Sequence, residues 1–476
     1  MIETEPRSEL KSWPDYRAVW RWHFYAGIVC IPFVIVLSIS GSVYLFKEEI
    51  ESWVDRPYDH LPIKGQPASA AAQVGAALAA FPGSTFGAYE IPVVDDASVR
   101  VVVGQQGKAQ RVYVHPVTLQ VLHSVAEEDR LMRWLFKVHG ELLMGSRGSA
   151  VVELAASWAI VMIVTGLYLW WPRGTSRMGG VVYPRLARGS RVFWRDIHGV
   201  TGFWISGFAL ILLLTGLPWA KFWGDYFRNV RRLTGTAVAR QEWSNGEVPK
   251  PVRAETRGAD EHAGHGSMGG GRADAGAPVD LSAIDRIVAT IRPLQLTPPV
   301  VIAPPGAKSF EGTSPEWTAK SMTANRPYQV ALTMDGATGE IKTRKDFGDR
   351  HIIDRVVGTG IAVHEGRLFG WPNQLIGLAT ASGLVLLSVS SVVLWWRRRE
   401  SGVLGAPRVL VRPQFSIGLM VLVVLFGVYL PLFGASLIAV LVLEWTLLRR
   451  IPRVRNWLGL QVTDHRSEVF ASEARA

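Results

Sequence analysis

The stretch HFYAGIVCIPFVIVLSISG, residues 23–41, decides the fold because it is an almost unbroken apolar run that opens on a histidine. With its continuation to residue 46 the run is about 23 residues long, enough for a helix to cross the hydrocarbon core of a bilayer. It ends in Lys47-Glu48-Glu49 and has no small-residue cleavage site. We therefore expect a retained membrane anchor here and not a cleaved signal peptide.

Similar apolar runs recur along the chain, in which 48% of the 476 residues are hydrophobic. Apolar residues gathered into long runs are typical of membrane proteins. We predict a mainly α-helical membrane protein with six transmembrane helices. The predicted spans are 24–46, 150–171, 199–219, 372–396 and two shorter helices within 415–448, which Pro431 and Gly434 divide. The single cysteine, Cys30, lies within the first span, so the chain has neither a disulfide framework nor an iron–sulfur site.

The net charge of +11 is concentrated in the short segments 172–198, 397–414 and 449–476. Short basic loops mark the cytoplasmic side of a membrane. We therefore expect both termini in the cytoplasm of a bacterium, and residues 47–149 and 220–371 on the periplasmic side of the inner membrane. The arginines alternate with the spans and form no basic patch interleaved with aromatic residues, so a nucleic-acid partner is not expected. The arginines concerned are Arg173, Arg177, Arg185, Arg188, Arg191, Arg195, Arg397, Arg398, Arg399, Arg408, Arg412, Arg449, Arg450, Arg453 and Arg455.

The chain contains an internal repeat. HFYAG at His23 matches HGVTG at His198, and Ser40-Gly41 matches Thr215-Gly216, both at an offset of 175 residues. At an offset of 225, DRLMRWLFKVHGELLMG (129–145) matches DRVVGTGIAVHEGRLFG (354–370), and TGLYLWW (165–171) matches SSVVLWW (390–396). A repeat of this length indicates a duplicated structural unit. We predict two copies of a span, an outside domain and a second span.

Each outside segment has the pattern of a small α+β module. In the first, PASAAAQVGAALAAF (67–81) has helical composition, and SVRVVVG (98–104) and QRVYVHPVTLQVLH (110–123) predict strands and a hairpin. In the second, DLSAIDRIVATIR (280–292) predicts a helix and YQVALTMDGATGEIKT (328–343) a hairpin with a turn at Asp335. The Gly-, Arg- and His-rich segment 245–279 is typical of a flexible insertion.

Four histidines lie at the ends of predicted spans, where polar residues are costly. His23 and His198 fall at the cytoplasmic ends of the first and third spans, and His139 and His364 at the periplasmic ends of the second and fourth. Two imidazoles can hold one haem iron, and a bis-histidine site suits electron transfer because it has no vacant position. We predict two such b haems, one near each membrane face. The alternative is that each histidine is an ordinary interfacial residue.

These features resemble the PepSY-associated transmembrane family, the iron-regulated inner-membrane proteins that include the ferric-siderophore (ferrioxamine) reductases. The resemblance rests on the two H-x3-G span starts, the two DR…H…G span starts and the two hairpins, and covers roughly residues 15–400. It implies PepSY-like outside modules and a di-haem b reductase that passes electrons to a periplasmic ferric siderophore, releasing ferrous iron. The last two spans and the His-rich insertion depart from the simpler four-span pattern, so the substrate stays open.

Other polar residues have two interpretations each. Arg130 and Arg355, nine residues before the outer histidines, suit haem propionates, or else pair with the neighbouring Asp129 and Asp354 and cap a helix start. His262, His265 and Met268 suit a soft metal such as copper, although a solvated linker is the alternative. The remaining histidines are predicted to be surface residues, with His351 the best of them for a substrate role: His60, His115, His123, His351 and His465.

The electron donor has to come from another molecule. The chain has no Gly-rich nucleotide fingerprint after a strand and no P-loop, and its cytoplasmic segments are too short for a flavin or nicotinamide domain. A quinol in the bilayer or a cytoplasmic flavoprotein fits equally well. The alternative function is a non-redox membrane protein whose outer modules bind a peptide, a protease or a metal chelate.

Overall fold

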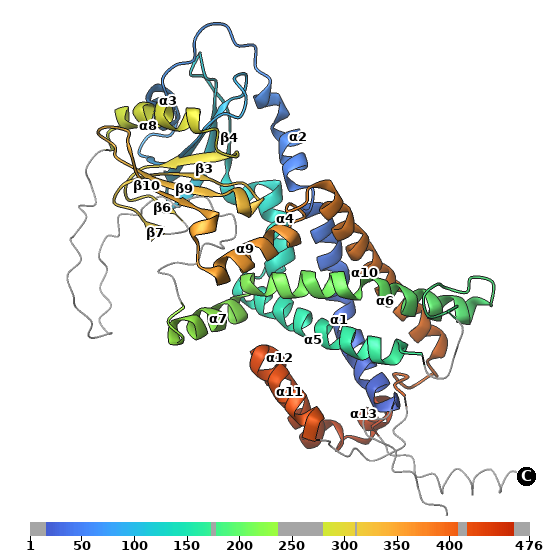
Figure 1. The fold of residues 1–476 in the computed structure, drawn as a ribbon. Helices are drawn as coiled ribbons and strands as arrows, with labels where there is room; N and C mark the ends of the chain where they lie inside the picture. The colour runs from blue at the N-terminus through green and yellow to red at the C-terminus, as the bar shows by residue number, and fades with distance from the viewer. Residues whose placement is uncertain (1–15, 173–177, 237–278, 310–311, 408–416, 461–476) are drawn as a thin grey trace, which may run out of the picture. The chain divides into compact units, whose positions relative to one another are not determined.

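The computed structural model describes residues 16–172, 178–236, 279–309, 312–407 and 417–460 (Figure 1). Its chain divides into two compact units. The first, called the helical unit, comprises Met1–Val43, Lys137–Phe227 and Leu375–Ala476, and the second, called the sheet unit, comprises Tyr44–Phe136 and Arg228–Gln374. The predicted insertion 245–279 falls almost entirely outside the described residues, as do His262, His265, Met268 and His465.

Five helices of the described residues are long and apolar enough to cross a membrane, so the chain is a multi-pass membrane protein. Their bounds are α1 Tyr16–Tyr44, α5 Ser146–Trp170, α6 Ser190–Gly216 continued by η2 Leu217–Trp219, α10 Trp371–Arg398, and α12 Pro431–Leu443 continued by η6 Glu444–Leu448. Their outer faces carry exposed aliphatic side chains such as Val29 (57% exposed). Such faces belong in lipid, where burial against protein is not needed.

The predicted sixth span is a short helix. α11, Ile417–Tyr429, has 13 residues, which is about 20 Å of helix against a hydrocarbon core of about 30 Å. α12 begins at Pro431, where the sequence placed the break, because proline suits the first turn of a helix. Six spans therefore stay a prediction, and five are supported.

Two predicted span starts differ from the structure. α1 begins at Tyr16 and α6 at Ser190, so His23 and His198 lie about two turns inside their helices and not at the ends. His139 and His364 lie on separate short helices, α4 (Leu131–Glu141) and α9 (Ile352–His364), before α5 and α10 begin. The breaks contain Gly145 at φ 58° and Gly370 at φ 63°, a left-handed conformation that glycine adopts without steric cost.

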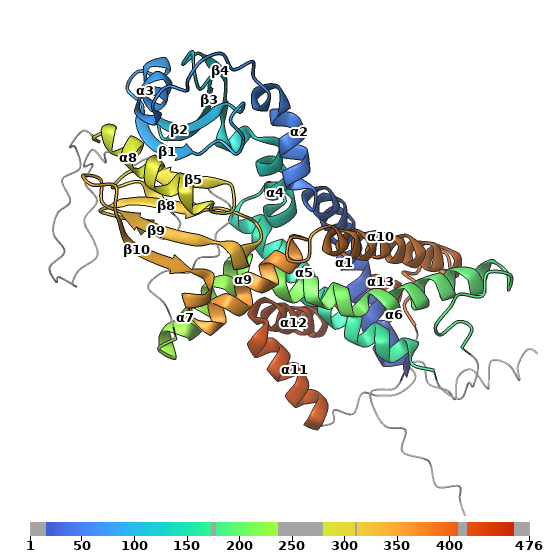
Figure 2. The same cartoon turned by 45° about the horizontal axis from the view of Figure 1, so that its top comes forward.

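One antiparallel sheet joins both outside segments of the sheet unit (Figure 2). The strand order is β10-β9-β8-β5-β1-β2-β3-β4. The two outside segments meet at the central β1–β5 pair, where Tyr89 lies opposite Ile302 and Glu90 opposite Val301. The strand bounds are β1 Thr85–Glu90, β2 Val99–Gln105, β3 Lys108–Val114, β4 Val121–Ala126, β5 Val300–Ala303, β8 Trp317–Ser321, β9 Val330–Met334 and β10 Ile341–Asp346, with β6 Lys308–Ser309 and β7 Gly312–Thr313 as a separate two-stranded ribbon. The two segments predicted as α+β modules therefore share one sheet and one core.

The shared core lies between this sheet and the helices α3 (Ala70–Ala80) and α8 (Ser282–Ile291). Val74 of α3 and Ile284 and Ile287 of α8 are fully buried in it. The Asp285 carboxylate accepts a hydrogen bond of 3.0 Å from the backbone N–H of Ala71, which joins the two helices. Both helices and both hairpins agree with the sequence-based predictions. The element order α3-β1-β2-β3-β4-α4-α5 recurs as α8-β5-β8-β9-β10-α9-α10, and its origin by duplication stays a prediction.

The hairpin turns explain one buried histidine. His115, expected on the surface, is only 9% exposed. Its Nδ1 accepts hydrogen bonds of 3.1 and 3.2 Å from the backbone N–H groups of Val117 and Thr118. Asp335 does the same in the β9–β10 turn, with bonds of 2.8 and 3.2 Å to Ala337 and Thr338. His115 is therefore a turn residue.

The remaining elements are α2 Lys47–Asp59, η1 Glu127–Asp129, α7 Lys221–Leu233, η3 Arg292–Leu294, η4 Arg326–Tyr328, η5 Phe347–Asp349 and α13 Pro452–Trp457.

Candidate functional site

His23 of α1 and His198 of α6 face each other inside the helical unit. Their ring centroids are 6.4 Å apart and their ring planes are inclined by 83°. They come from helix starts 175 residues apart in the chain, as the repeat predicted.

The outward nitrogen of each ring is held by a hydroxyl of another helix. Nδ1 of His23 lies 3.1 Å from Oγ1 of Thr165 on α5, and Nδ1 of His198 lies 3.1 Å from Oγ of Ser390 on α10. The carbonyl oxygen of Leu387 is also 3.3 Å from Nδ1 of His198. Four helices therefore meet at this pair: α1, α5, α6 and α10.

These contacts assign the imidazole tautomers. Each hydroxyl already donates its only proton to a helix carbonyl, Thr165 to Val161 at 2.8 Å and Ser390 to Leu387 at 3.0 Å. With each hydroxyl oxygen as the acceptor toward the ring, we assign the proton to Nδ1, as the Leu387 carbonyl beside Nδ1 of His198 also favours. In a neutral imidazole the other nitrogen, Nε2, has the free lone pair. This is the nitrogen that a metal binds when Nδ1–H is hydrogen-bonded.

The ring separation fits one metal atom between two Nε2 atoms. An imidazole nitrogen binds a metal at about 2 Å, and the ring centroid lies about 1.1 Å behind that nitrogen, so a linear arrangement separates the centroids by about 6.2 Å. The observed 6.4 Å agrees with this value. Among the described residues no group of three or more His, Cys, Asp or Glu side chains forms a metal-binding cluster. A two-histidine site leaves the equatorial positions to a macrocycle, so the donor set suits a haem iron.

Glycines make the close approach possible. A Cβ on Gly166 of α5 would lie 3.1 Å from Cε1 of His23, so a larger residue there would displace the ring. Gly27 and Gly202, one turn after His23 and His198, are less crowded: a Cβ would meet only Met162 Cε at 3.7 Å and Leu387 Cδ2 at 3.6 Å, respectively. The H-x3-G pattern therefore leaves low-profile backbone beside each histidine, as a flat cofactor requires.

His139 has the same environment as His23. Its Nδ1 lies 3.0 Å from Oγ of Ser40 on α1, and this hydroxyl donates to the carbonyl of Val36 at 2.7 Å. A Cβ on Gly41 would lie 3.0 Å from Cε1 of His139. Ser40 and Gly41 therefore contact the ring of His139 in the same way as Thr165 and Gly166 contact the ring of His23.

His364 is half-buried at the end of α9, in the sheet unit. The turn that follows it is fixed to the start of α2. Arg367 forms ion pairs with Glu48 (3.0 Å) and Glu49 (2.9 Å), and Gln374 donates to Glu49 at 2.8 Å. Burial works to raise the pKa of Glu49, but the hydrogen bonds from Arg367 and Gln374 outweigh it and lower the pKa to about 2. The pairing of His364 with His139 rests on the sequence repeat.

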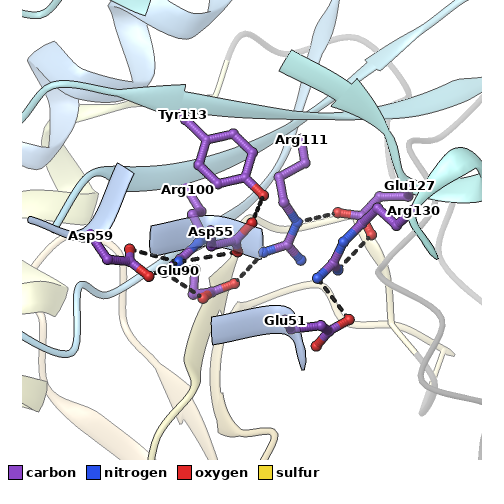
Figure 3. Close-up of polar contacts among 9 residues, drawn as sticks. All are labelled: Glu51, Asp55, Asp59, Glu90, Arg100, Arg111, Tyr113, Glu127 and Arg130. Atoms are coloured by element: carbon purple, nitrogen blue, oxygen red, sulfur yellow. Dashed lines mark hydrogen bonds and ion pairs between the residues drawn. The ribbon is translucent and has the colours of Figure 1, made fainter. Parts of the chain in front are cut away.

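Arg130 belongs to a network of buried charges on the sheet (Figure 3). Its guanidinium contacts Glu51 at 2.9 Å and Glu127 at 3.3 Å, and not the neighbouring Asp129. Next to it Arg111 contacts Glu127 at 2.5 Å and Glu90 at 2.7 Å. The network continues through Arg100, Asp55, Asp59 and Tyr113 and attaches α2 to strands β1, β2 and β3.

The equivalent arginine of the second copy has different surroundings. Arg355 is exposed on α9, and its neighbour Asp354 forms a buried ion pair of 2.6 Å with Arg231. The proposed pairing of each arginine with its neighbouring aspartate is therefore wrong in both copies. A role toward propionates stays a prediction for Arg130 and Arg355. His351 accepts a hydrogen bond of 3.2 Å from the N–H of Ile353 and so caps α9.

The comparison with known families agrees with this architecture. The model described as the PepSY-associated TM region matches residues 20–398, which include all four histidines and both halves of the sheet. The chain belongs to the PepSY-associated TM family. No curated protein sequence matches it.

Within this PepSY-associated protein, sequence reasoning missed the hydroxyl partners of the histidines. Thr165 and Ser390 occupy the same position of the repeat, the first residue of TGLYLWW and of SSVVLWW. A hydroxyl at the same position of both repeat segments was the signal that pointed to them. The exposed His60 and His123 agree with their prediction as surface residues.

Proposed function

We propose that this PepSY-associated protein is a di-haem b reductase of the bacterial inner membrane. It carries electrons from a quinol or a cytoplasmic flavoprotein to a ferric siderophore on the periplasmic side, where ferrous iron is released. The observation that carries the proposal is the His23–His198 pair, with its 6.4 Å ring separation and its hydrogen-bonded Nδ1 atoms.

The protein's own residues bind, orient and shield in this proposal. His23 and His198 would hold one haem, and Thr165 and Ser390 would fix the orientation of the two rings. Trp170 and Phe203 stack at 4.1 Å between α5 and α6 and help to exclude water. A bis-histidine haem supplies one-electron transfer and has no open position for oxygen or substrate. The siderophore therefore does not bind the haem iron, and the electron reaches it from outside the haem's coordination sphere.

A second haem site is needed because one site cannot span the thickness of the membrane. Ser40, the partner of His139, lies 17 residues after His23 on the same helix, which is about 26 Å of helix axis. That distance is close to the hydrocarbon thickness of about 30 Å. We assign the second haem to His139 and His364, the equivalent pair of the repeat. Two haem sites divide the distance across the membrane into shorter electron-transfer steps.

The basic residues support the direction of transfer. α6 begins beside Arg185 and Arg195, which both pair with Asp196, and α10 ends at Arg397 and Arg398. Arg185 and Arg195 lie at the end of α6 that carries His198, and Arg398 stacks over Trp20 and Phe24 at the end of α1 that carries His23. Because short basic loops stay in the cytoplasm, the His23–His198 site faces the donor and both termini are cytoplasmic. The ferric siderophore as acceptor rests on the resemblance to the family's reductases.

The test begins with the colour of the purified protein. A reduced-minus-oxidised spectrum is expected to show b-type bands with about two haems per chain. Purified protein reconstituted in vesicles with a quinol donor inside the bilayer is then expected to reduce a ferric hydroxamate siderophore, measured by trapping ferrous iron. A folded but colourless preparation would contradict the proposal and favour a binding role for the PepSY-like modules. A coloured preparation that reduces none of several ferric chelates would contradict the proposal that a ferric siderophore is the substrate.

A further inference from the structure

We propose that Thr165 and Ser390 are positioning residues that set the reduction potential of the site between His23 and His198. This inference rests on the proposed haem function and goes beyond it, because it concerns residues that bind no metal. Their hydroxyl oxygens lie 3.1 Å from the Nδ1 atoms of the two rings. A group that accepts a hydrogen bond from Nδ1–H makes Nε2 a stronger donor to a metal.

The hydroxyls act only as acceptors here because the helices use their protons. Thr165 donates to Val161 O at 2.8 Å and Ser390 to Leu387 O at 3.0 Å. Donation to a carbonyl polarises the hydroxyl and strengthens its acceptor side, an example of hydrogen-bond cooperativity. The chain from carbonyl through hydroxyl to Nδ1–H therefore pushes electron density toward Nε2. A more basic axial ligand stabilises the ferric state and lowers the reduction potential.

Neither hydroxyl is the sole hydrogen-bond partner of its ring. The Leu387 carbonyl lies 3.3 Å from Nδ1 of His198, so this ring keeps an acceptor when Ser390 is lost. The ring of His23 likewise has a backbone hydrogen bond to Met162 beside its contact with Thr165. We therefore expect removal of either hydroxyl to weaken the hydrogen bonding of Nδ1 without abolishing it.

Substitutions that remove only the hydroxyl test this idea in the full-length protein. Thr165→Val keeps the side-chain shape and Ser390→Ala removes one atom. The midpoint potential of one of the two haems is expected to rise in both, by up to about tenfold in the reduction equilibrium for Thr165→Val, which corresponds to about 59 mV for one electron. Thr165→Ser and Ser390→Thr restore the hydroxyl and are expected to restore the potential.

Ser388→Ala is the matched control. Ser388 lies on the same helix as Ser390, is buried, and donates to Leu384 O at 2.9 Å. Its loss is expected to leave both potentials unchanged. Loss of the haem in Thr165→Val but not in Thr165→Ser would also support the inference, since it would show that the hydroxyl holds the ligand. Two haems with unchanged potentials in Thr165→Val and Ser390→Ala would overturn it and leave the proposed function standing. A wild-type protein without haem would instead overturn the proposed function.

Discussion

At the scale of single residues, the site depends on which nitrogen of each histidine is free. The histidines themselves were predictable because the repeat keeps them in both copies. Their tautomers were not predictable, since these depend on Thr165 and Ser390, which lie 142 and 192 residues away from their partners in the chain. Contacts of this separation arise from helix packing, which apolar periodicity does not specify.

The inclination of the rings gives a spectroscopic prediction. The planes of His23 and His198 are inclined by 83°. Near-perpendicular axial imidazoles leave the two iron d orbitals that interact with them nearly equal in energy. The oxidised protein is therefore expected to give a highly anisotropic low-spin ferric signal in electron paramagnetic resonance. Only rhombic signals, typical of parallel imidazole planes, would contradict the ring arrangement at this site.

The close contact at Gly166 gives a second prediction. In Gly166→Ala the new Cβ would lie 3.1 Å from Cε1 of His23, so the ring must shift by a few tenths of an ångström. Overpacking of this kind costs about 1–3 kcal/mol. We expect weaker retention of one haem during purification, measured as the haem-to-protein ratio. Gly27→Ala, where the new atom meets only Met162 at 3.7 Å, is the control, and equal haem loss in both variants would contradict the explanation.

At the scale of secondary-structure elements, α2 is attached to the sheet by buried charges. Arg111 lies between Glu90 and Glu127 (Figure 3). Burial opposes ionisation of both carboxylates, but the nearby Arg111 outweighs it and lowers the pKa of each. The sequence did not predict this network, because its members come from five separate elements, α2, β1, β2, β3 and η1, and each appears alone in the chain as an ordinary polar residue.

Removing the Arg111 side chain is expected to lower the stability of the sheet unit. Arg111→Ala leaves two buried carboxylates without their shared cation, and breaking a buried ion pair from one side costs about 3–5 kcal/mol. Hydrogen exchange of β2 and β3 in the full-length protein measures the loss of local stability. Arg344→Ala removes a cation from an exposed pair with Asp346 and is expected to cost less than about 1 kcal/mol. Similar effects of the two substitutions would contradict a stabilising role for the network.

The turn between α9 and α10 is expected to loosen in acid. Glu49 has its pKa lowered from 4.5 to about 2 by hydrogen bonds from Arg367 and Gln374, which outweigh its desolvation. A carboxylate whose pKa is lower in the folded state stabilises that state above pH 4.5 and loses its contribution as pH falls toward 2. The protection factors of residues 365–370 in hydrogen exchange, which correct for the intrinsic effect of pH on the rate, should therefore fall over this interval. In Glu49→Gln the exchange is expected to be fast already at neutral pH and less sensitive to acid, and an unchanged pH profile would contradict the role of Glu49.

At the scale of the whole molecule, the sequence predicted the spans, the helices and the hairpins but not how the two copies combine. The runs 24–46 and 372–396 correspond to α1 and α10, because uninterrupted apolar runs of this length have few alternatives to a membrane helix. The shared sheet was missed because Tyr89 pairs with Ile302, 213 residues later. Register between distant edge strands depends on their hydrogen bonding and shared core and leaves no local pattern in the sequence.

The central claim is that His23 and His198 hold one haem together. The most direct measurement is the number of haems per chain in His23→Ala, His198→Ala and the double variant, with the exposed His60→Ala as control. Because both histidines serve the same iron, each single variant and the double variant are expected to retain one haem, while the control retains two. Two haems in either single variant, or none in the double variant beside one in each single variant, would contradict the account.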